Sequence, residues 1–336
     1  MIRRRRSQYD LFGGPWWRAL LPIADRAVRR LILWPTRPLP RPLRVTLRRQ
    51  LLARHEIARA RRAPLFVIGH PKSGNTWLRT MISRFYQVKY NLPSDFVLKS
   101  DELHRLEPAI PRFFFSNGYY SYERVIAEAL SGPHPDPELG GKPLLFIARH
   151  PCDLAVSWYF QFTRRISLAK AELIQAEIAQ PIDRSSIDMW DFVMKSELGL
   201  ENLIAFLNGW NARLRGLQQG YRLSYEAMRK APDEAVKRFL DLAGETYEES
   251  QVREAVDFAS FENLQKLEAQ GRFKHGGMQK DAKGDPNSRK VRRGKVGGYR
   301  DYFTPEQLEQ MDDLVDRKLD PELGYGSANA GLPANA

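Results

Sequence analysis

The feature that most constrains the fold is an apolar run that passes through a short turn into a helix pattern, between residues 64 and 86. The run "PLFVIG" (64–69) is typical of a strand buried in a parallel sheet, because helices cover both faces of such a sheet. A turn with proline and glycine follows, "HPKSG" (70–74), and helical spacing begins at Thr76. This order is typical of a phosphate-binding loop, although the G-x-x-x-x-G-K-[ST] spacing of nucleoside triphosphatases is missing.

Further strand patterns predict the rest of the sheet. They lie between helix patterns, at residues 112–116, 143–149 and 221–226. Strands that alternate with helices predict an α/β fold with a P-loop-like central parallel sheet flanked by helices on both faces. We predict that this domain spans residues 64–325, with a helical insertion at 164–200 and a flexible tail at 326–336.

The positive charge of the chain is concentrated at its N-terminus. The whole chain has a net charge of +13, and residues 1–63 alone hold 17 arginines, no lysine and three acids. We predict that these residues form a basic helical arm, with an amphipathic helix from Pro22 and an extended Pro-rich segment at 34–44. A basic amphipathic helix beside tryptophans suits an anionic membrane surface, which residues 1–60 would contact. The alternative is a helix packed on the domain with its arginines in solvent.

Other sequence features concern the cellular location of the protein and its partners. The single cysteine, Cys152, excludes an intrachain disulfide and fits a reducing cytoplasm. No apolar run approaches the ~18–20 residues of a membrane span, and the N-terminal arginines are not followed by the apolar core of a secretion signal. Nucleic acid is a weaker partner for the arm, because aromatic and basic residues do not alternate on a binding sheet. We expect a cytoplasmic protein, peripheral on the inner face of the membrane if the arm binds it.

The turn after the first strand is a candidate anion site. Backbone N–H groups and the positive end of a helix dipole point out of the sheet at such a turn. Gly74 lets the backbone approach an anion closely, and Lys72 adds a mobile charge. Ser73, Asn75 and Thr76 can donate hydrogen bonds. A tetrahedral oxyanion fits this set of donors, and a plain capped turn is the alternative.

A later strand end repeats this logic in "ARHPCDLAVSWY" (148–159). Arg149 closes the strand and Ser157 lies about two turns into the next helix. Arginine and serine at the carboxyl end of a strand make a second anion site, in the crevice where doubly wound sheets bind ligands. Arg149 could equally pair with Asp153, which would leave no site.

A third stretch, "RRGKVGGYRDYFT" (292–304), concentrates cations and glycines beyond the last core helices. A solvated loop is the usual meaning of such a run. As a closing flap it would bring Arg292, Arg293 and backbone N–H groups onto a phosphate.

Taken in order, the three stretches resemble the PAPS-dependent sulfotransferase family, whose donor is 3′-phosphoadenosine 5′-phosphosulfate (PAPS). The stretches and the family patterns that they match are "PKSGNTW" (71–77) with P-K-S-G-T-T-W, "RHPCDLAVS" (149–157) with R-N-P-K-D-V-A-V-S, and residues 292–304 with R-K-G-x-x-G-D-W-K-x-x-F-T. Softer matches lie at 223–244 and 260–265. The resemblance covers roughly residues 64–318 and points to a cytosolic-type, bacterial-like member.

The resemblance implies roles for the matched residues. The 5′-phosphosulfate would be held by Lys72, Ser73, Gly74, Asn75 and Thr76. The 3′-phosphate, which distinguishes this donor from ATP, would be held by Arg149, Ser157, Arg292, Arg293 and Gly294. Trp77 and Phe261 would sandwich the adenine with Tyr225 nearby, core packing being the alternative for both rings. Lys72 and backbone dipoles would supply the neutralisation that Mg²⁺ gives a kinase, so no metal is expected.

The resemblance fails at one catalytic position. The family usually supplies a histidine base in P-R-x-x-K-T-H, whereas the aligned "PRFFFSNG" (111–118) places Asn117 there. Asparagine cannot act as a base near neutral pH, although it can orient an acceptor hydroxyl by a hydrogen bond. His104, an acid such as Asp101 or Glu102, or a base on the acceptor itself could replace the histidine.

We therefore expect an enzyme that transfers a sulfo group from PAPS to a hydroxyl or amine, with Lys72, Asn117 and His104 as catalytic candidates. The acceptor is a small molecule, or a glycolipid or saccharide if the arm binds a membrane. One alternative is a non-catalytic or impaired PAPS-binding homologue, because of Asn117. Another is a P-loop nucleotide kinase, which would need a Walker-type Lys-Ser/Thr pair and a metal-binding Asp.

Overall fold

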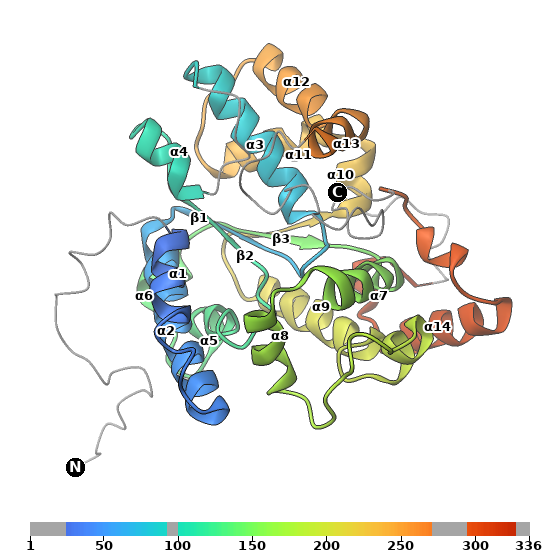
Figure 1. The fold of residues 1–336 in the computed structure, drawn as a ribbon. Helices are drawn as coiled ribbons and strands as arrows, with labels where there is room; N and C mark the ends of the chain where they lie inside the picture. The colour runs from blue at the N-terminus through green and yellow to red at the C-terminus, as the bar shows by residue number, and fades with distance from the viewer. Residues whose placement is uncertain (1–24, 93–99, 271–293, 327–336) are drawn as a thin grey trace.

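The computed structural model describes residues 25–92, 100–270 and 294–326. A fully parallel sheet with strand order β2-β1-β3-β4 forms its centre (Figure 1). The strands lie where the sequence predicted them, at β1 (Leu65–Ile68), β2 (Phe113–Ser116), β3 (Leu144–Ala148) and β4 (Gly220–Ser224). The predicted fold class, a parallel sheet between helices, is confirmed.

Alternate strand residues face opposite helix layers. Phe66, Phe114 and Phe146 belong to one buried core, which holds α1 (Asp25–Leu33), α2 (Arg41–Arg62), α5 (Val125–Ser131), α6 (Pro137–Gly140), α7 (Pro151–Phe160), α8 (Leu168–Gln175), α9 (Leu200–Arg215) and α14 (Pro305–Lys318). Val67 and Ile147 belong to the other, with α3 (Asn75–Lys89), α4 (Ser100–Leu106), α10 (Tyr225–Lys230), α11 (Pro232–Leu242), α12 (Glu249–Phe258) and α13 (Phe261–Ala269). Burying such a side chain contributes about 1.5–3 kcal/mol, which explains strands that are apolar on both faces.

Short irregular helices complete the first layer. They are η2 (Gln161–Arg165), η3 (Asp191–Lys195), η5 (Gly298–Asp301) and η6 (Pro321–Leu323). The predicted helical insertion at 164–200 is helical only in part, because residues 176–188 form turns and irregular chain. Within it the Asp183 carboxylate accepts hydrogen bonds from Ser185 and Ser186. Such local side-chain bonds compete with helix formation.

Helix α2 is part of the domain core rather than a separate arm. Val45, Leu52 and Ala60 are buried in the first core. The prediction of an extended segment at 34–44 is wrong, because residues 34–38 form hydrogen-bonded turns. The helix begins at Arg41, since a proline is tolerated in the first helical turn. Packing on the domain is therefore what the structure shows for α2.

The arginines of α2 pair with acids of the domain. Arg44 and Arg48 both contact Glu172 on α8. Arg61 lies 3.0 Å from Asp136. The positive charge of this segment is thus partly neutralised within the fold.

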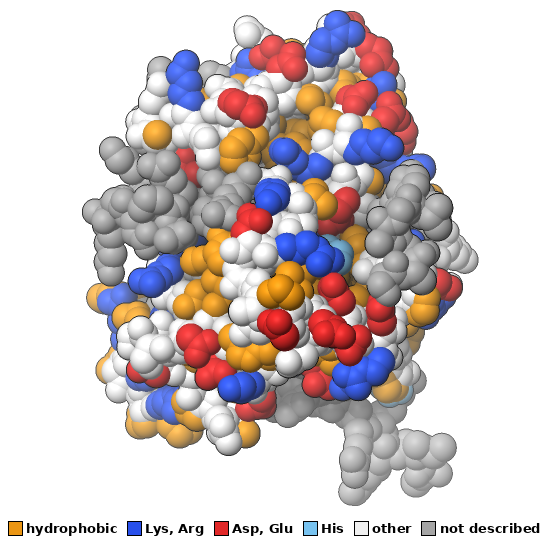
Figure 2. Space-filling view, turned by 90° about the vertical axis from the view of Figure 1, so that its right-hand side faces the viewer, with side chains coloured by type: hydrophobic (Ala, Val, Ile, Leu, Met, Phe, Trp, Pro, Cys, Tyr) orange, Lys and Arg blue, Asp and Glu red, His pale blue; other side chains and the backbone are white. Residues whose placement is uncertain are grey.

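Two surface observations bear on partners. Within the three described ranges, no helix is both long enough and apolar enough to cross a membrane. Figure 2 shows one face of the molecule, where Lys and Arg side chains are interspersed with acidic and hydrophobic ones. The described residues of this face form no continuous basic surface of the kind that nucleic acids require.

Candidate active site

The carboxyl ends of the strands open into a cavity of about 310 Å³. The loops that follow all four strands contribute to its lining, together with the start of α13 and residues 294–299. The predicted site residues that line it are Lys72, Gly74, Asn75, Thr76, Trp77, Asn117, Arg149, Ser157, Tyr225, Phe261 and Gly294. Ser73 and His104 are absent from the lining, and Arg292 and Arg293 lie outside the described residues.

The loop after β1 has a backbone shape that brings its N–H groups toward the cavity. Lys72 has φ 85° and Gly74 has φ 113°, both in the left-handed region. A Cβ at Gly74 would lie 2.7 Å from Met228 and 3.0 Å from Tyr225. Left-handed backbone at a lysine is uncommon and concentrates at functional sites. The glycine is required both by its φ and by this close approach.

Ser73 and Asn75 brace the loop from inside. The Ser73 hydroxyl donates to the carbonyl oxygen of His70 at 2.8 Å, and the Asn75 amide donates to that of Gly69 at 2.7 Å. The side chains that we expected to donate to an anion are therefore turned toward the loop itself. Within the described residues, the Trp77 and Leu78 N–H groups donate to the Gly74 oxygen, and no backbone acceptor is found for those of Asn75 and Thr76. These two N–H groups remain as donors of this loop.

Arg149 joins the two predicted anion sites. Its Nη1 donates to the backbone oxygen of Lys72 at 2.9 Å, and its guanidinium lies 4.4 Å from the centre of the Tyr225 ring. Its Nε is buried and has no hydrogen-bond partner among the described residues. Ser157 lines the same cavity. A buried N–H group that lacks an acceptor and lies beside a cavity favours binding of an anion there, because the anion supplies the missing hydrogen bond.

Asp153 is used elsewhere, so the alternative that it pairs with Arg149 is not what the structure shows. Its carboxylate accepts from the backbone N–H of Gly297 at 2.7 Å and of Tyr299 at 3.0 Å. These bonds fix the described end of the third sequence stretch beside α7. Gly294 is thereby held at the cavity.

Trp77 and Phe261 both line the cavity. The Trp77 indole N–H donates to the Ala259 oxygen at 2.8 Å. Arg229 lies 5.5 Å from the Trp77 ring centre and also lines the cavity. The sequence analysis missed Arg229; its only signal is that it stands one helical turn after Tyr225.

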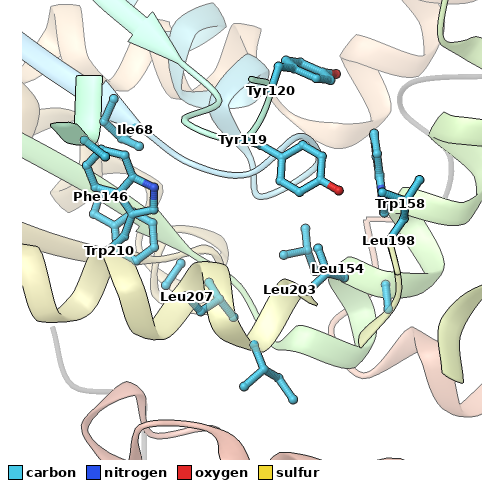
Figure 3. Packing of buried hydrophobic residues seen from close by; sticks show 14 of the residues in the cluster. Ile68, Tyr119, Tyr120, Phe146, Leu154, Trp158, Leu198, Leu203, Leu207 and Trp210 are labelled. Atoms are coloured by element: carbon cyan, nitrogen blue, oxygen red, sulfur yellow. The ribbon is translucent and has the colours of Figure 1, made fainter. Parts of the chain in front are cut away.

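The cavity lining also holds aromatic and cationic residues without a predicted role. Among them are Tyr120, Phe160, Arg165 and Lys170. The Lys170 ammonium lies 4.4 Å from the centre of the Tyr120 ring. Figure 3 shows the neighbouring Tyr119 ring inside the core, on the side of Trp158, which it meets at 5.4 Å between ring centres. The sequence analysis assigned no role to these four residues.

Asn117 rests on a buried acid that the sequence analysis missed. The Glu123 carboxylate accepts from the backbone N–H of Asn117 at 3.2 Å and from its side-chain amide at 3.4 Å. Burial, followed by the charge of Glu56, raises the pKa of Glu123 to about 7. The sequence signal that could have revealed Glu123 is an acidic residue that follows several tyrosines in "NGYYSYE" (117–123). His104 instead bonds through Nδ1 to the Ile110 oxygen at 2.7 Å.

The remaining polar groups near the loops are structural. Burial lowers the pKa of His70 to about 3 and that of His150 to about 4, so both imidazoles are neutral. Burial raises the pKa of the Cys152 thiol. None of the three lines the cavity. Cys152 is therefore a plain buried thiol, and the two histidines are neighbours of the site.

A parallel sheet with a cationic cavity at its strand ends defines the class of α/β proteins that bind nucleotides and other phosphate compounds. Within that class, the model of the sulfotransferase domain family matches residues 62–321, and the chain belongs to this family. The prediction of a PAPS-dependent sulfotransferase enzyme is thereby confirmed. The kinase and the non-catalytic alternatives are not favoured.

Characterised relatives agree with this assignment. The chain is 25% identical over 273 residues to flavonol 3-sulfotransferase of Flaveria bidentis, which covers 76% of this chain and 81% of the relative. It is 28% identical over 334 residues to cytosolic sulfotransferase 17 of Arabidopsis thaliana, with coverages of 94% and 84%. Both are plant proteins.

Solved structures of similar fold include retinol dehydratase with androsterone and the inactive cofactor PAP, at a TM-score of 0.49 and 17% identity. That match covers 76% of this chain and 81% of the other. Mouse sulfotransferase SULT7A1 with PAP matches at a TM-score of 0.45 and 18% identity, with coverages of 76% and 84%.

Proposed function

We propose that this enzyme transfers a sulfo group from PAPS to a hydroxyl group of a small-molecule acceptor. The observation that carries the proposal is the contact between Arg149 and the loop after β1, because it makes two cationic sites into one cavity. A donor with a phosphosulfate at one end of its ribose and a phosphate at the other requires two such sites at a fixed separation. An amine acceptor would use the same chemistry.

The residues of the cavity fit this donor. Lys72 and the N–H groups at the start of α3 suit the 5′-phosphosulfate. Arg149, with its unpartnered Nε, and Ser157 suit the 3′-phosphate, and Gly294 would add a backbone N–H. Trp77 and Phe261 offer flat faces for adenine, beside Tyr225. Arg292 and Arg293 belong to the proposal through the family pattern alone.

The proposed chemistry needs charge stabilisation at the donor and an oriented acceptor. The donor supplies the sulfo group: its sulfur bonds to the acceptor oxygen as the bond to the bridging phosphate oxygen breaks, leaving 3′,5′-ADP and the acceptor proton, which passes to the new phosphate or to water. Lys72 and backbone N–H groups stabilise the charge on the departing phosphate. Asn117 accepts a hydrogen bond from the acceptor hydroxyl and orients it.

The proposal includes no metal ion. Asp153 is the one acidic side chain in the described lining, and both its oxygens accept backbone N–H groups. A magnesium site would need carboxylate oxygens that are free to coordinate. The cationic side chains and helix start supply the positive charge instead.

The acceptor end favours a small aromatic hydroxyl compound. Tyr120 and Phe160 offer apolar surface there, and Arg165 and Lys170 add positive charge. Two of the relatives are named for action on flavonols. A glycolipid or saccharide acceptor would require the protein to reach a membrane.

Membrane contact is a further part of the proposal, together with a place on the inner face of a bacterial cytoplasmic membrane. Three large apolar side chains of the N-terminal segment are exposed, Leu31 by 60%, Trp34 by 71% and Leu43 by 55%. Arginines alternate with them in the sequence. Apolar side chains among arginines suit an anionic membrane surface.

Calorimetry with three nucleotides tests the donor assignment. We expect 3′,5′-ADP to bind at least about tenfold more tightly than 5′-AMP, since one added charge-assisted contact contributes about 1.5–3 kcal/mol. ATP should bind more weakly than 3′,5′-ADP. Tighter binding of ATP, or equal binding of 3′,5′-ADP and 5′-AMP, would refute the proposal.

A further inference from the structure

Asn117 is held in place by contacts with a buried acid, Glu123. Glu123 is only 4% exposed, and its carboxylate accepts both the backbone N–H and the side-chain NH2 group of Asn117. Gly118 makes the turn between them, with φ 58° and no room for a Cβ, which would lie 2.9 Å from Ile68 and Trp210. Asn117 lines the cavity and Glu123 does not. The turn thus presents an amide to the cavity and a buried acid behind it.

An ionised carboxylate fixes the direction of an amide. It has no proton to donate, so only the NH2 side of Asn117 can face it. The Oδ1 atom is then the polar atom left to face the cavity. A hydrogen bond to a charged acceptor also polarises the amide, which makes its oxygen a stronger acceptor. A protonated Glu123 could donate instead, and the direction of the amide would no longer be fixed.

We propose that Glu123 is a positioning residue for sulfo transfer, whose carboxylate holds the Asn117 amide with Oδ1 directed at the acceptor hydroxyl. This inference rests on the proposed function, because it needs an acceptor beside Asn117. It explains how the chain can work without the histidine that its family usually has there. Glu123 itself touches neither donor nor acceptor.

Burial has the largest effect on the pKa of Glu123, and charges outside its own loop shift it further. Glu56 on α2 raises the pKa of Glu123, whereas Arg29 on α1 and Lys170 on α8 lower it. Arg29 and Glu56 also contact each other. The other groups that face Glu123 are the buried phenols of Tyr120 and Tyr122. With a pKa of about 7, Glu123 changes its charge in the neutral range.

The N-terminal helices therefore have a role at the active site. Val45, Leu52 and Ala60 dock α2 on the core, and this docking brings Glu56 beside Glu123. Glu56 is 1% exposed, so water screens its charge little. Helices α1 and α2, which belong to the basic N-terminal segment, thus influence the charge of Glu123.

The pH dependence of turnover tests the inference. With ³⁵S-labelled PAPS and quercetin as the acceptor, wild-type kcat/KM should fall below a midpoint near pH 7, as Glu123 is protonated. Glu123→Gln should lower kcat/KM at pH 8 about tenfold and abolish that acid limb, because glutamine can donate as well as accept. Its affinity for 3′,5′-ADP should not change. An acid limb that persists in Glu123→Gln would overturn the inference.

Two substitutions should shift the midpoint of the acid limb of kcat/KM in opposite directions. Glu56→Gln removes a repelling charge and should shift the midpoint to lower pH, whereas Arg29→Gln should shift it to higher pH. Glu128→Gln, an exposed acid on α5, is the matched control and should leave it in place. A merely structural role for Glu123 predicts no such pair of opposite shifts. Midpoints that stay where they are in both variants would count against the inference.

NMR gives a readout without turnover. In protein labelled with ¹³C at glutamate carboxyls and ¹⁵N at asparagine amides, the Glu123 signal, identified by its loss in Glu123→Gln, should titrate near pH 7. The side-chain signal of Asn117 should follow the same midpoint. Titration of Glu123 near 4.5, or an Asn117 signal that ignores it, would overturn the inference. If the wild-type protein did not bind 3′,5′-ADP, the proposed function would be refuted. The NMR titrations would still show whether Glu123 controls the Asn117 amide.

Discussion

At the scale of single residues, the direction of a side chain matters as much as its type. Ser73 and Asn75 stand in a loop that the sequence identifies, yet their polar atoms bond to His70 and Gly69. Arg149, in contrast, reaches across to the oxygen of Lys72. The residue types of an anion loop do not decide which of its polar side chains brace it. Short hydrogen bonds within a folded loop make that decision.

Arg149 should discriminate between nucleotides by their 3′-phosphate. Arg149→Gln should weaken binding of 3′,5′-ADP about 10- to 100-fold, the loss of one or two charge-assisted hydrogen bonds. Binding of 5′-AMP should change by less than about threefold, because it has no 3′-phosphate. Calorimetry measures both affinities. Arg84→Gln, which removes an arginine that pairs with Glu254 away from the cavity, is the matched control; equal weakening of both nucleotides by Arg149→Gln would contradict the assignment.

At the scale of elements, local sequence patterns locate the strands and helices, whereas long-range packing determines which of their faces are buried. Each strand is a short apolar run between turn residues, so periodicity alone located all the strands of the sheet. Helix α2 has the same basic character as its neighbours in sequence, but four of its residues, Val45, Leu52, Ala53 and Ala60, are buried in the core. Periodicity shows that a helix has an apolar face and does not show what covers it.

The exposed apolar side chains of the N-terminal segment should decide membrane binding. Replacing Leu31 and Trp34 together by serine should reduce binding to vesicles of 30% phosphatidylserine in phosphatidylcholine at least about tenfold, since each buries apolar area worth about 1.5–3 kcal/mol. Co-sedimentation measures this binding. Leu106→Ser, which changes a leucine that is 49% exposed on α4, should leave binding unchanged. Undiminished binding of the double variant would reject membrane contact through these residues.

At the scale of the whole molecule, the polar groups buried beneath the site make stability depend on pH. His150 caps α7, where its Nδ1 accepts from the Cys152 N–H at 3.3 Å. Burial lowers the pKa of His150 from 6.5 to about 4. As pH falls below 6.5, the unfolded chain therefore binds a proton before the folded one does, and stability is lost between about pH 6.5 and pH 4.

Removing this titration should flatten the pH profile of stability. His150→Asn keeps a helix-capping side chain without a titrating ring. The free energy of unfolding of this variant, relative to wild type, should rise by roughly 1–3 kcal/mol between pH 7 and pH 4. Urea denaturation at several pH values measures it, with the exposed His134→Asn as the control. A difference that stays constant over this range would contradict the expectation.

The sequence by itself determined what is local: the strands, the turn that follows each of them, and hence many of the residues that line the cavity. Parallel strands carry their carboxyl ends to one edge of the sheet, so adjacent motifs must meet there once the fold class is known. Only the tertiary structure decided which partner each polar group takes. Lys72 and Arg149 meet across 77 positions of the chain. The pKa of Glu123 depends on its burial and on the charges of Glu56, Lys170 and Arg29, which belong to three other helices. Contacts between distant segments depend on how whole helices dock, and no spacing within a single stretch of sequence encodes that docking.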